Sequence, residues 1–243
     1  MINRAALIEK LKQDLVIDPA TTAVLAIDVH RGHLDPSVAT KPLDGDAARK
    51  VVQNVGRLLE LARGVGIKII YIIVEQRMIP GVGRESLVNP RTRAVRDARL
   101  DLGIRDQEDT DHHNLEGSVQ TEIMPELRPE GENFVIRTKR RLSCFYGTDL
   151  EILLRALKVD TLVISGVNTN TCVQGAAFEA HNHDYRAVVV SDCVASMYGE
   201  EFHRFALQNI DYCFGWVLSL KELEQKLNKA VMVARSQSAG GGG

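Results

Sequence analysis

The sequence has no long hydrophobic run, no paired cysteine motif and no excess of charge of one sign, and each absence excludes a class of protein. No apolar stretch approaches the roughly 20 residues that a helix needs to cross a bilayer, and residues 1–18 are too charged for a secretory signal peptide. The four cysteines contain no C-x-x-C pair, so their spacing indicates neither a disulfide framework nor a structural zinc site. A formal net charge of −2 gives no support for nucleic acid or an anionic membrane as the partner. We therefore expect a cytoplasmic protein that acts on a small molecule.

The sequence does contain an alternation of short apolar runs and amphipathic segments. Six runs are typical of strands, at 22–27, 67–74, 133–137, 161–165, 187–190 and 212–214. The alternation predicts a three-layer αβα domain, with a mostly parallel six-stranded sheet and helices on both faces. We expect a lead-in helix that packs against the domain within residues 1–20, one domain over 21–228, and a flexible, glycine-ended tail over 229–243.

Local patterns predict where several helices begin. Asp46 precedes a segment with apolar residues at helical spacing, so we expect it to cap that helix. The patterns at Thr148–Glu151 and Ser219–Glu222 are typical of capping boxes. Residues 75–117 have no clear periodicity, and a long irregular segment in a compact domain is usually functional or mobile.

Three reactive side chains follow the expected ends of three different strands. Asp28 follows 22–27, Lys139 lies just past 133–137, and a tight polar turn leads from 161–165 to Cys172. In parallel α/β sheets, reactive groups collect at the C-terminal ends of the strands. Taken singly, these residues are equally well explained as a loop cap, a solvated lysine and a small core residue. Together they predict a site with Cys172 as nucleophile, Asp28 as proton acceptor and Lys139 as the cation beside them.

The position of Cys172 also predicts its ionisation state. A thiol between a strand end and a helix N-terminus meets unpaired N–H groups and the positive end of the helix dipole. Both favour the thiolate, and both can hold a developing oxyanion. Cys144, Cys193 and Cys213 lack this combination of turn and helix start, so we interpret them as packing residues.

Further polar and aromatic residues near the expected site are candidates for binding substrate: His30, Arg77, Phe145, Tyr146 and Thr169. An arginine of the Arg-rich stretch 77–105 could bind a carboxylate through two hydrogen bonds, although a solvated face or a subunit contact is the simpler explanation for any one of them. The histidines at positions 30 and 33 suit metal ligands, loop hydrogen bonding or pocket lining. Core packing explains the two aromatic residues equally well.

Three segments resemble the isochorismatase-like cysteine hydrolases, a superfamily that includes nicotinamidases, N-carbamoylsarcosine amidases and ureido-compound amidohydrolases. The segments are AVLAIDVHRG around Asp28, RTKRRLSCFYGTDLEILLRALKVDTLVISG around Lys139 and GVNTNTCVQGAAFEAHNHDY around Cys172. The resemblance spans nearly the whole ordered chain, from Thr22 to Leu227. It implies a Rossmann-type αβα fold.

The resemblance also implies a catalytic triad of Asp28, Lys139 and Cys172. In the superfamily the cysteine attacks an amide carbonyl, ammonia or an amine leaves, and water hydrolyses the thioester. A cis peptide at Val167–Asn168 is implied as well, with the N–H groups of Asn168 and Cys172 forming an oxyanion hole. Nicotinamidases bind a metal through an Asp-x-His after the second strand, but this sequence has Glu75-Gln76-Arg77 there, so we expect no metal and no cofactor.

These features predict a cysteine-dependent amidohydrolase that cleaves the C–N bond of a small linear amide, carbamoyl or ureido compound. We expect it to act as a homo-oligomer, a dimer or a tetramer. One alternative is a vinyl-ether hydrolase of the isochorismatase type, which does not need a thiol, and another is a catalytically idle binding or assembly subunit. The presence of Cys172 favours the amidohydrolase.

Overall fold

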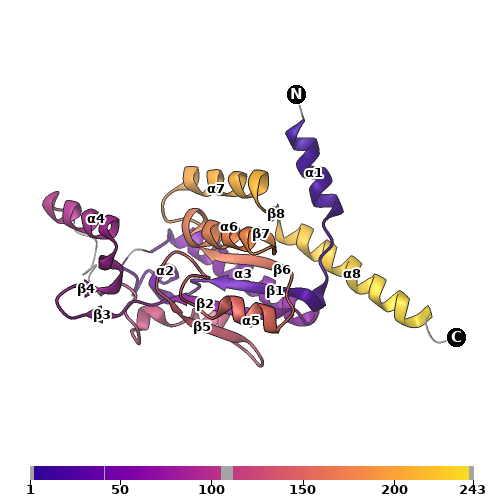
Figure 1. Ribbon diagram of the computed structural model, residues 1–243, viewed down its shortest axis with the longest axis horizontal. Coiled ribbons are helices and arrows are strands. Elements are labelled where there is room, and N and C mark those ends of the chain that lie inside the picture. Colours follow the sequence, from indigo (N-terminus) through magenta and orange to yellow (C-terminus); the bar gives the residue numbers. More distant parts are fainter. Residues whose placement is uncertain (1–2, 41, 105–111, 241–243) are drawn as a thin grey trace.

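The computed structural model describes residues 3–40, 42–104 and 112–240, and its centre is a single six-stranded sheet (Figure 1). The strand order is β5-β2-β1-β6-β7-β8, and all five neighbouring pairs are parallel. The strands are β1 (Thr22–Ile27), β2 (Lys68–Val74), β5 (Phe134–Lys139), β6 (Thr161–Val167), β7 (Arg186–Ala195) and β8 (Trp216–Leu218). The predicted α/β class and six-stranded parallel sheet are confirmed.

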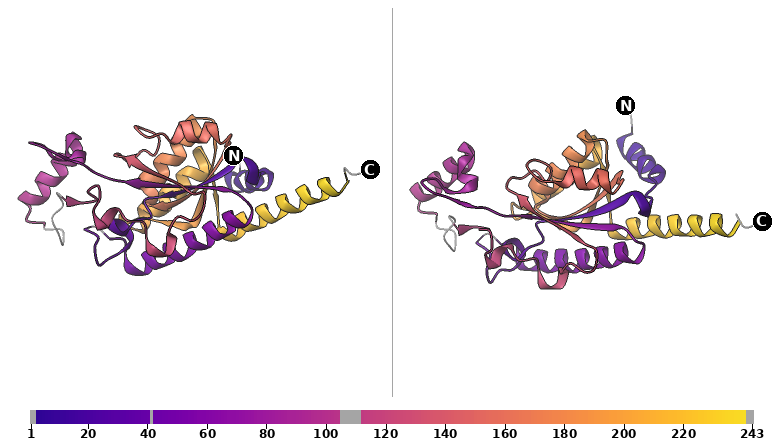
Figure 2. Two further views of the ribbon diagram at one scale, coloured as in Figure 1. Left: turned by 90° about the horizontal axis from the view of Figure 1, so that it is seen from below. Right: turned by 60° about the horizontal axis from the view of Figure 1, so that its bottom comes forward.

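Side chains of each strand alternate between two apolar cores, one on each face of the sheet. On β1, Val24 and Ala26 belong to one core, and Ala23, Leu25 and Ile27 belong to the other. The first core is closed by α3 (Gly45–Gly64) and α8 (Leu220–Gly240), and the second by α5 (Leu150–Ala156), α6 (Gln174–Asn182) and α7 (Glu200–Cys213). Figure 2 shows the two helix layers on opposite sides of the sheet. Because both faces are covered, β1 is a continuous apolar run rather than an alternating one.

The segment expected to be irregular contains an ordered arm. It consists of β3 (Met78–Ile79), β4 (Gly83–Arg84) and α4 (Pro90–Asp101), and it projects from the body of the molecule (Figure 1). The side chain of Asn89 accepts hydrogen bonds from the N–H groups of Arg91 and Thr92, and Pro90 takes the first helical position. No side chain of α4 is buried in its own chain, so the helix has no apolar stripe that periodicity could detect.

The last strand lies at Trp216–Leu218 and not at 212–214, because α7 continues to Cys213. Ala206 and Ile210 are buried at helical spacing and keep this segment helical. Gly215 then lets the chain pass close to β7, since a Cβ there would lie 2.8 Å from the carbonyl oxygen of Ala187.

Two predicted helix starts have different outcomes. The cap of α3 is Asp44 and not Asp46, because the Asp44 carboxylate accepts hydrogen bonds from the N–H groups of Asp46 and Ala47. The capping box at the start of α8 is confirmed. The N–H of Ser219 donates to Glu222 Oε2 at 2.6 Å, and the N–H of Glu222 donates to Ser219 Oγ at 3.2 Å.

The lead-in helix is present as α1 (Arg4–Asp14), and it lies against the domain, where Trp216 Nε1 donates to the carbonyl oxygen of Leu11 at 3.2 Å and Arg4 lies over the ring of Tyr212. None of its side chains is fully buried. The C-terminal end differs from its prediction. The tail expected from residue 229 is instead part of α8, which continues to Gly240. Residues 229–235 are mostly good helix formers, which favours continuation of the helix. Within the described residues, no helix is both long enough and apolar enough to cross a membrane.

Gly166 is the residue at which the sheet tolerates no side chain. It lies beside Ile27 in the β1–β6 register, its φ is +110°, and a Cβ would lie 1.9 Å from the Ile27 carbonyl oxygen.

We expect Gly166→Ala to lower the free energy of unfolding by about 3 kcal/mol or more, through backbone strain and overpacking. Gly64→Ala is the control, since nothing lies within 4 Å of a Cβ there. Equal urea midpoints for both variants would contradict the prediction.

Candidate active site

The C-terminal ends of three strands bring Asp28, Lys139 and Cys172 together, as the sequence predicts. Asp28 follows β1, and its left-handed backbone, with φ +51°, lets its N–H donate to the carbonyl oxygen of Ile72 on β2 at 2.8 Å. Lys139 is the last residue of β5 rather than the residue beyond it. Cys172 lies in the π-helical turn Thr169–Val173, between β6 and α6.

Lys139 is the centre of this cluster. Its Nζ donates to Asp28 Oδ2 at 2.6 Å and to Cys172 Sγ at 3.3 Å. Asp28 Oδ1 accepts a hydrogen bond from the N–H of Val74 at 2.7 Å, so both carboxylate oxygens are engaged. The ion pair is fully buried and Cys172 is 6% exposed. A buried charge pair persists only where geometry and hydrogen bonds compensate for the lost hydration, and these contacts supply that compensation.

Burial and mutual attraction determine the charges of the pair. Burial alone would raise the pKa of Asp28, but the positive charge of Lys139 and its hydrogen bond to the carboxylate hold that pKa below its usual value. Burial alone would lower the pKa of Lys139, and the charge of Asp28 instead raises it well above the ordinary lysine value. At neutral pH the site therefore contains a carboxylate and an ammonium ion.

Cys172 differs from its prediction, because the structure favours the thiol. Burial raises the pKa of Cys172 to about 11, although Lys139 acts in the opposite direction. The negative charge of the nearby Asp28 carboxylate raises the pKa further. The helix N-terminus favours the thiolate, but the anion beside the sulfur opposes it. A thiol next to a carboxylate can transfer its proton when it attacks, without first forming a free thiolate.

The turn before Cys172 has the backbone that the resemblance implies. The Val167–Asn168 peptide bond is cis. Asn168 is 5% exposed, and its Oδ1 accepts a hydrogen bond from the N–H of Met197 at 2.9 Å. The oxyanion hole formed by the N–H groups of Asn168 and Cys172 stays a prediction.

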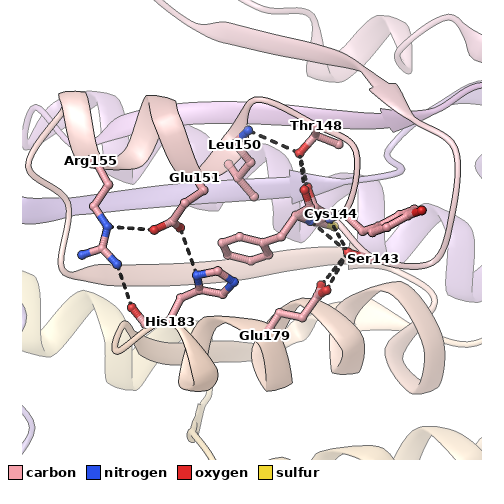
Figure 3. Close-up of polar contacts among 10 residues, drawn as sticks. Ser143, Cys144, Thr148, Leu150, Glu151, Arg155, Glu179 and His183 are labelled. Carbon is pink, nitrogen blue, oxygen red and sulfur yellow. Dashed lines mark hydrogen bonds and ion pairs between the residues drawn. The ribbon is translucent and has the colours of Figure 1, made fainter.

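The loop after Lys139 is tied to the helix that follows Cys172 (Figure 3). Ser143 Oγ lies 2.7 and 2.8 Å from the two carboxylate oxygens of Glu179 on α6, and accepts hydrogen bonds from the N–H groups of Phe145 and Tyr146. The ring of Phe145 stacks on His183, with centroids 5.0 Å apart. These contacts fix the loop of Lys139 relative to α6.

The same region shows why the expected capping box at Thr148 is wrong (Figure 3). Thr148 Oγ1 donates to the carbonyl oxygen of Cys144 at 2.6 Å, and the N-cap position falls on Asp149, whose side chain makes no capping hydrogen bond. Glu151 forms an ion pair with Arg155 at 2.8 Å instead of reaching back to Thr148. Thr148 Oγ1 still accepts a hydrogen bond from the N–H of Leu150 at 3.3 Å, but the reciprocal contact from Glu151 is replaced by its ion pair with Arg155 one turn later.

His30 is buried beside the triad. Its Nδ1 lies 2.8 Å from the carbonyl oxygen of Gln120, and burial lowers the pKa of His30 to about 3, so the ring is neutral. Its ring centroid is 4.6 Å from that of His33. Within residues 3–40, 42–104 and 112–240, no three His, Cys, Asp or Glu side chains are placed to hold a metal ion.

The other substrate-binding candidates lie in different surroundings. Arg77 is exposed and forms two hydrogen bonds with the Glu85 carboxylate, at 2.9 and 3.0 Å, which occupy its guanidinium group. Tyr146 is 71% exposed, whereas Phe145 is buried in the same apolar cluster as Cys172. Thr169 is fully buried, and its hydroxyl bonds to His203 rather than facing solvent. Arg105 lies outside the described residues.

Two residues near the site had no signal in the sequence. Tyr198 follows β7 with its side chain 55% exposed, and partial burial of its hydroxyl near Cys172 raises the pKa of Tyr198. His203 lies on α7, 34 positions beyond its partner Thr169, and its Nδ1 is 2.8 Å from Thr169 Oγ1. Neither belongs to a recognisable motif, because a contact between separate elements leaves no local pattern.

The fold and the site define an α/β protein with a cysteine beside a buried Asp–Lys pair at the C-terminal edge of a parallel sheet. The Isochorismatase domain matches residues 22–222 of this sequence. The chain belongs to the isochorismatase family.

Several curated relatives are similar over most of their length. Ureidoacrylate amidohydrolase RutB of Methylobacterium radiotolerans is 28% identical over 219 residues, 88% of this chain and 83% of the relative. RutB of Acinetobacter baylyi is 27% identical, over 82% of this chain and 80% of the relative. Among solved structures, a cysteine hydrolase from Pseudomonas syringae pv. phaseolicola has a TM-score of 0.72 at 23% identity, covering 89% of this chain and 96% of that one. N-carbamoylsarcosine amidase from Thermoplasma acidophilum has a TM-score of 0.59 at 23% identity, covering 82% and 96%.

The raised pKa of Cys172, about 11, predicts how its alkylation depends on pH. We expect the rate with iodoacetamide, measured by mass spectrometry of the Cys172 peptide, to rise about tenfold per pH unit between pH 7 and 10, because only the thiolate reacts. A small model thiol should level off near its pKa of about 8.5. A plateau for Cys172 at or below that pH would contradict the structure and restore the thiolate prediction.

Proposed function

We propose that this protein is a cysteine-dependent amidohydrolase that cleaves the C–N bond of a small linear amide, carbamoyl or ureido compound and releases ammonia. The observation that carries the proposal is the position of Lys139 Nζ, 2.6 Å from Asp28 and 3.3 Å from Cys172 Sγ in a buried cluster. This arrangement contains a nucleophile, a proton acceptor and a fixed cation within contact distance.

The first half of the proposed reaction forms a thioester. Cys172 Sγ attacks the carbonyl carbon while Asp28 accepts the thiol proton, so that no free thiolate accumulates. The carbonyl oxygen becomes an oxyanion, which the N–H groups of Asn168 and Cys172 would stabilise. When the oxyanion collapses, the C–N bond breaks, and Asp28 returns the proton to the departing nitrogen. Ammonia leaves, and the acyl group stays on Cys172.

The second half releases the acid. A water molecule attacks the thioester carbonyl while Asp28 accepts one of its protons, and collapse of the second tetrahedral intermediate returns that proton to Cys172 Sγ. In the resting site the Asp28 carboxylate raises the pKa of Lys139. Lys139 keeps its positive charge through the reaction, because when Asp28 holds the proton the negative charge is on the substrate oxyanion nearby. Its charge offsets the negative charge that moves between Asp28 and the substrate.

The substrate class follows from the relatives and the chemistry together. The RutB relatives are ureidoacrylate amidohydrolases, and a fold neighbour is an N-carbamoylsarcosine amidase. Both names describe hydrolysis of C–N bonds other than peptide bonds, and the second supports carbamoyl compounds. Cys172 favours this chemistry over vinyl-ether hydrolysis, which needs no thiol. The proposal therefore places ureido and carbamoyl compounds ahead of other amides.

The proposal includes a cytoplasmic homo-oligomer, a dimer or a tetramer. All four cysteines are free thiols, as a reducing compartment would keep them. Helix α4 buries no side chain in its own chain, while Leu100 and Leu102 at its end are 62% and 73% exposed. An isolated helix of this length is marginal in water, so a second copy is the partner that would stabilise it.

Ammonia release from a panel of small amides tests the activity. The panel is biuret, N-carbamoylsarcosine, ureidoacrylate, maleamate and nicotinamide. We expect the wild type to release ammonia from at least one ureido or carbamoyl compound, and Cys172→Ala and Cys172→Ser to lose at least about a thousandfold in kcat, because the nucleophile is lost or replaced by a much weaker one. Cys213→Ala, which removes an exposed thiol, should retain wild-type activity.

The alternatives give different results in the same assay. Full activity of Cys172→Ser on the substrate would refute the thioester mechanism. Cleavage of isochorismate by wild type and Cys172→Ala alike would identify a vinyl-ether hydrolase. If no compound of the panel releases ammonia and Cys172 resists alkylation even at pH 10, the result would support a catalytically idle binding subunit.

A further inference from the structure

The turn that carries Cys172 is held by a separate segment of the chain. Residues 196–203, which follow β7 and enter α7, make three hydrogen bonds to the turn, and we call this segment the brace. The N–H of Met197 donates to Asn168 Oδ1 at 2.9 Å, Ser196 Oγ donates to Asn170 Oδ1 at 2.7 Å, and His203 Nδ1 lies 2.8 Å from Thr169 Oγ1. Three consecutive residues of the turn are thus fixed from one side.

The contact between Thr169 and His203 is the most enclosed of the three. Thr169 is fully buried, and its hydroxyl has little access to water as an alternative partner. His203 is half-buried on the first turn of α7, where its own N–H donates to the carbonyl oxygen of Gly199. A buried hydroxyl that loses its partner destabilises the arrangement that buries it. The imidazole therefore constrains Thr169, and Thr169 lies three residues before the sulfur.

The charge of His203 suits this role at neutral pH. Burial lowers the pKa of His203, and the carboxylate of Glu200 on the same helix only partly offsets that effect. The ring is therefore neutral. Depending on the tautomer, Nδ1 either accepts a hydrogen bond from the Thr169 hydroxyl or donates one to it.

We propose that His203 is a positioning residue which, through the hydroxyl of Thr169, holds the turn so that Cys172 stays beside Lys139 and Asp28. Thr169 then serves as the link between brace and turn, rather than as the substrate-binding residue that the sequence suggests. The proposal rests on the proposed hydrolase function only where kcat is measured, since the alkylation rate of Cys172 tests it without a substrate. Displacement of a reacting group by about 1 Å can lower a rate a hundredfold, so the contact matters without touching substrate.

Substitutions at position 203 separate hydrogen bonding from bulk. His203→Asn keeps a polar atom at the δ position, where Nδ1 now lies, whereas His203→Gln places its amide one atom further out and His203→Leu has none. We expect kcat to fall about 10- to 100-fold in His203→Leu and His203→Gln with KM changed less than threefold, and His203→Asn to recover most of the loss. His181→Leu, at an exposed histidine of α6, is the control.

Substitutions at Thr169 test the link from the other side. Thr169→Val keeps the shape and removes the hydroxyl, and Thr169→Ser keeps the hydroxyl. We expect Thr169→Val to match His203→Leu, and the double variant to lose no more than either single variant, because both remove one interaction. Losses that multiply in the double variant would overturn the proposal.

The rate of Cys172 alkylation provides a readout that needs no substrate. Burial is the main cause of the raised pKa of Cys172, so a displaced turn that exposes the sulfur should lower that pKa. At pH 8 we expect iodoacetamide to react at least about threefold faster with His203→Leu and Thr169→Val than with wild type, and at the wild-type rate with His203→Asn and Thr169→Ser.

The two readouts distinguish the possible failures. If the wild type hydrolyses nothing but the alkylation pattern holds, the proposed function fails and the positioning role stands. If alkylation and kcat of His203→Leu equal those of wild type, or if His203→Asn behaves like His203→Leu, the positioning role is refuted.

Discussion

The fully buried ion pair between Asp28 and Lys139 is the interaction on which the rest of the site depends. Removing two charges from water is expensive, and a bond of 2.6 Å compensates only if both ends are held in place. Asp28 itself has a left-handed backbone conformation, and its carboxylate accepts a hydrogen bond from the N–H of Val74. Lys139 is fixed because it is the last residue of β5. The order β5-β2-β1-β6 places these ends at one edge, and β6 brings Cys172 to the same place.

The pair also explains why the nucleophile rests as a thiol. The environment that pairs a carboxylate with an ammonium ion offers Cys172 one charge of each sign, so little electrostatic advantage remains to offset burial. Burial shields the thiol from adventitious reaction, and in the proposed mechanism the neighbouring Asp28 accepts its proton. The proposed chemistry therefore begins with a proton transfer that accompanies attack, and the carboxylate is as necessary as the sulfur.

Two separate sets of contacts hold the site. Ser143 and Glu179 join the loop after Lys139 to α6, while the brace of residues 196–203 holds the turn before Cys172. Both sets join segments that are distant in the sequence, and both end on the short stretch of chain that carries the cysteine. The position of Sγ thus depends on α7 and on the loop after β5, as well as on its own strand and helix.

The sequence by itself determined the fold class, the approximate strands and the grouping of Asp28, Lys139 and Cys172, because apolar runs and strand ends are local features that topology turns into proximity. It did not determine the protonation state of Cys172, which depends on the carboxylate and on burial. It missed α4, which buries no side chain, and it placed the last strand four residues early, because the apolar residues of α7 continue to Cys213. Only the tertiary structure paired Arg77 with Glu85, Glu179 with Ser143 and His203 with Thr169, since such pairings depend on where separate elements meet and leave no periodic trace in the chain.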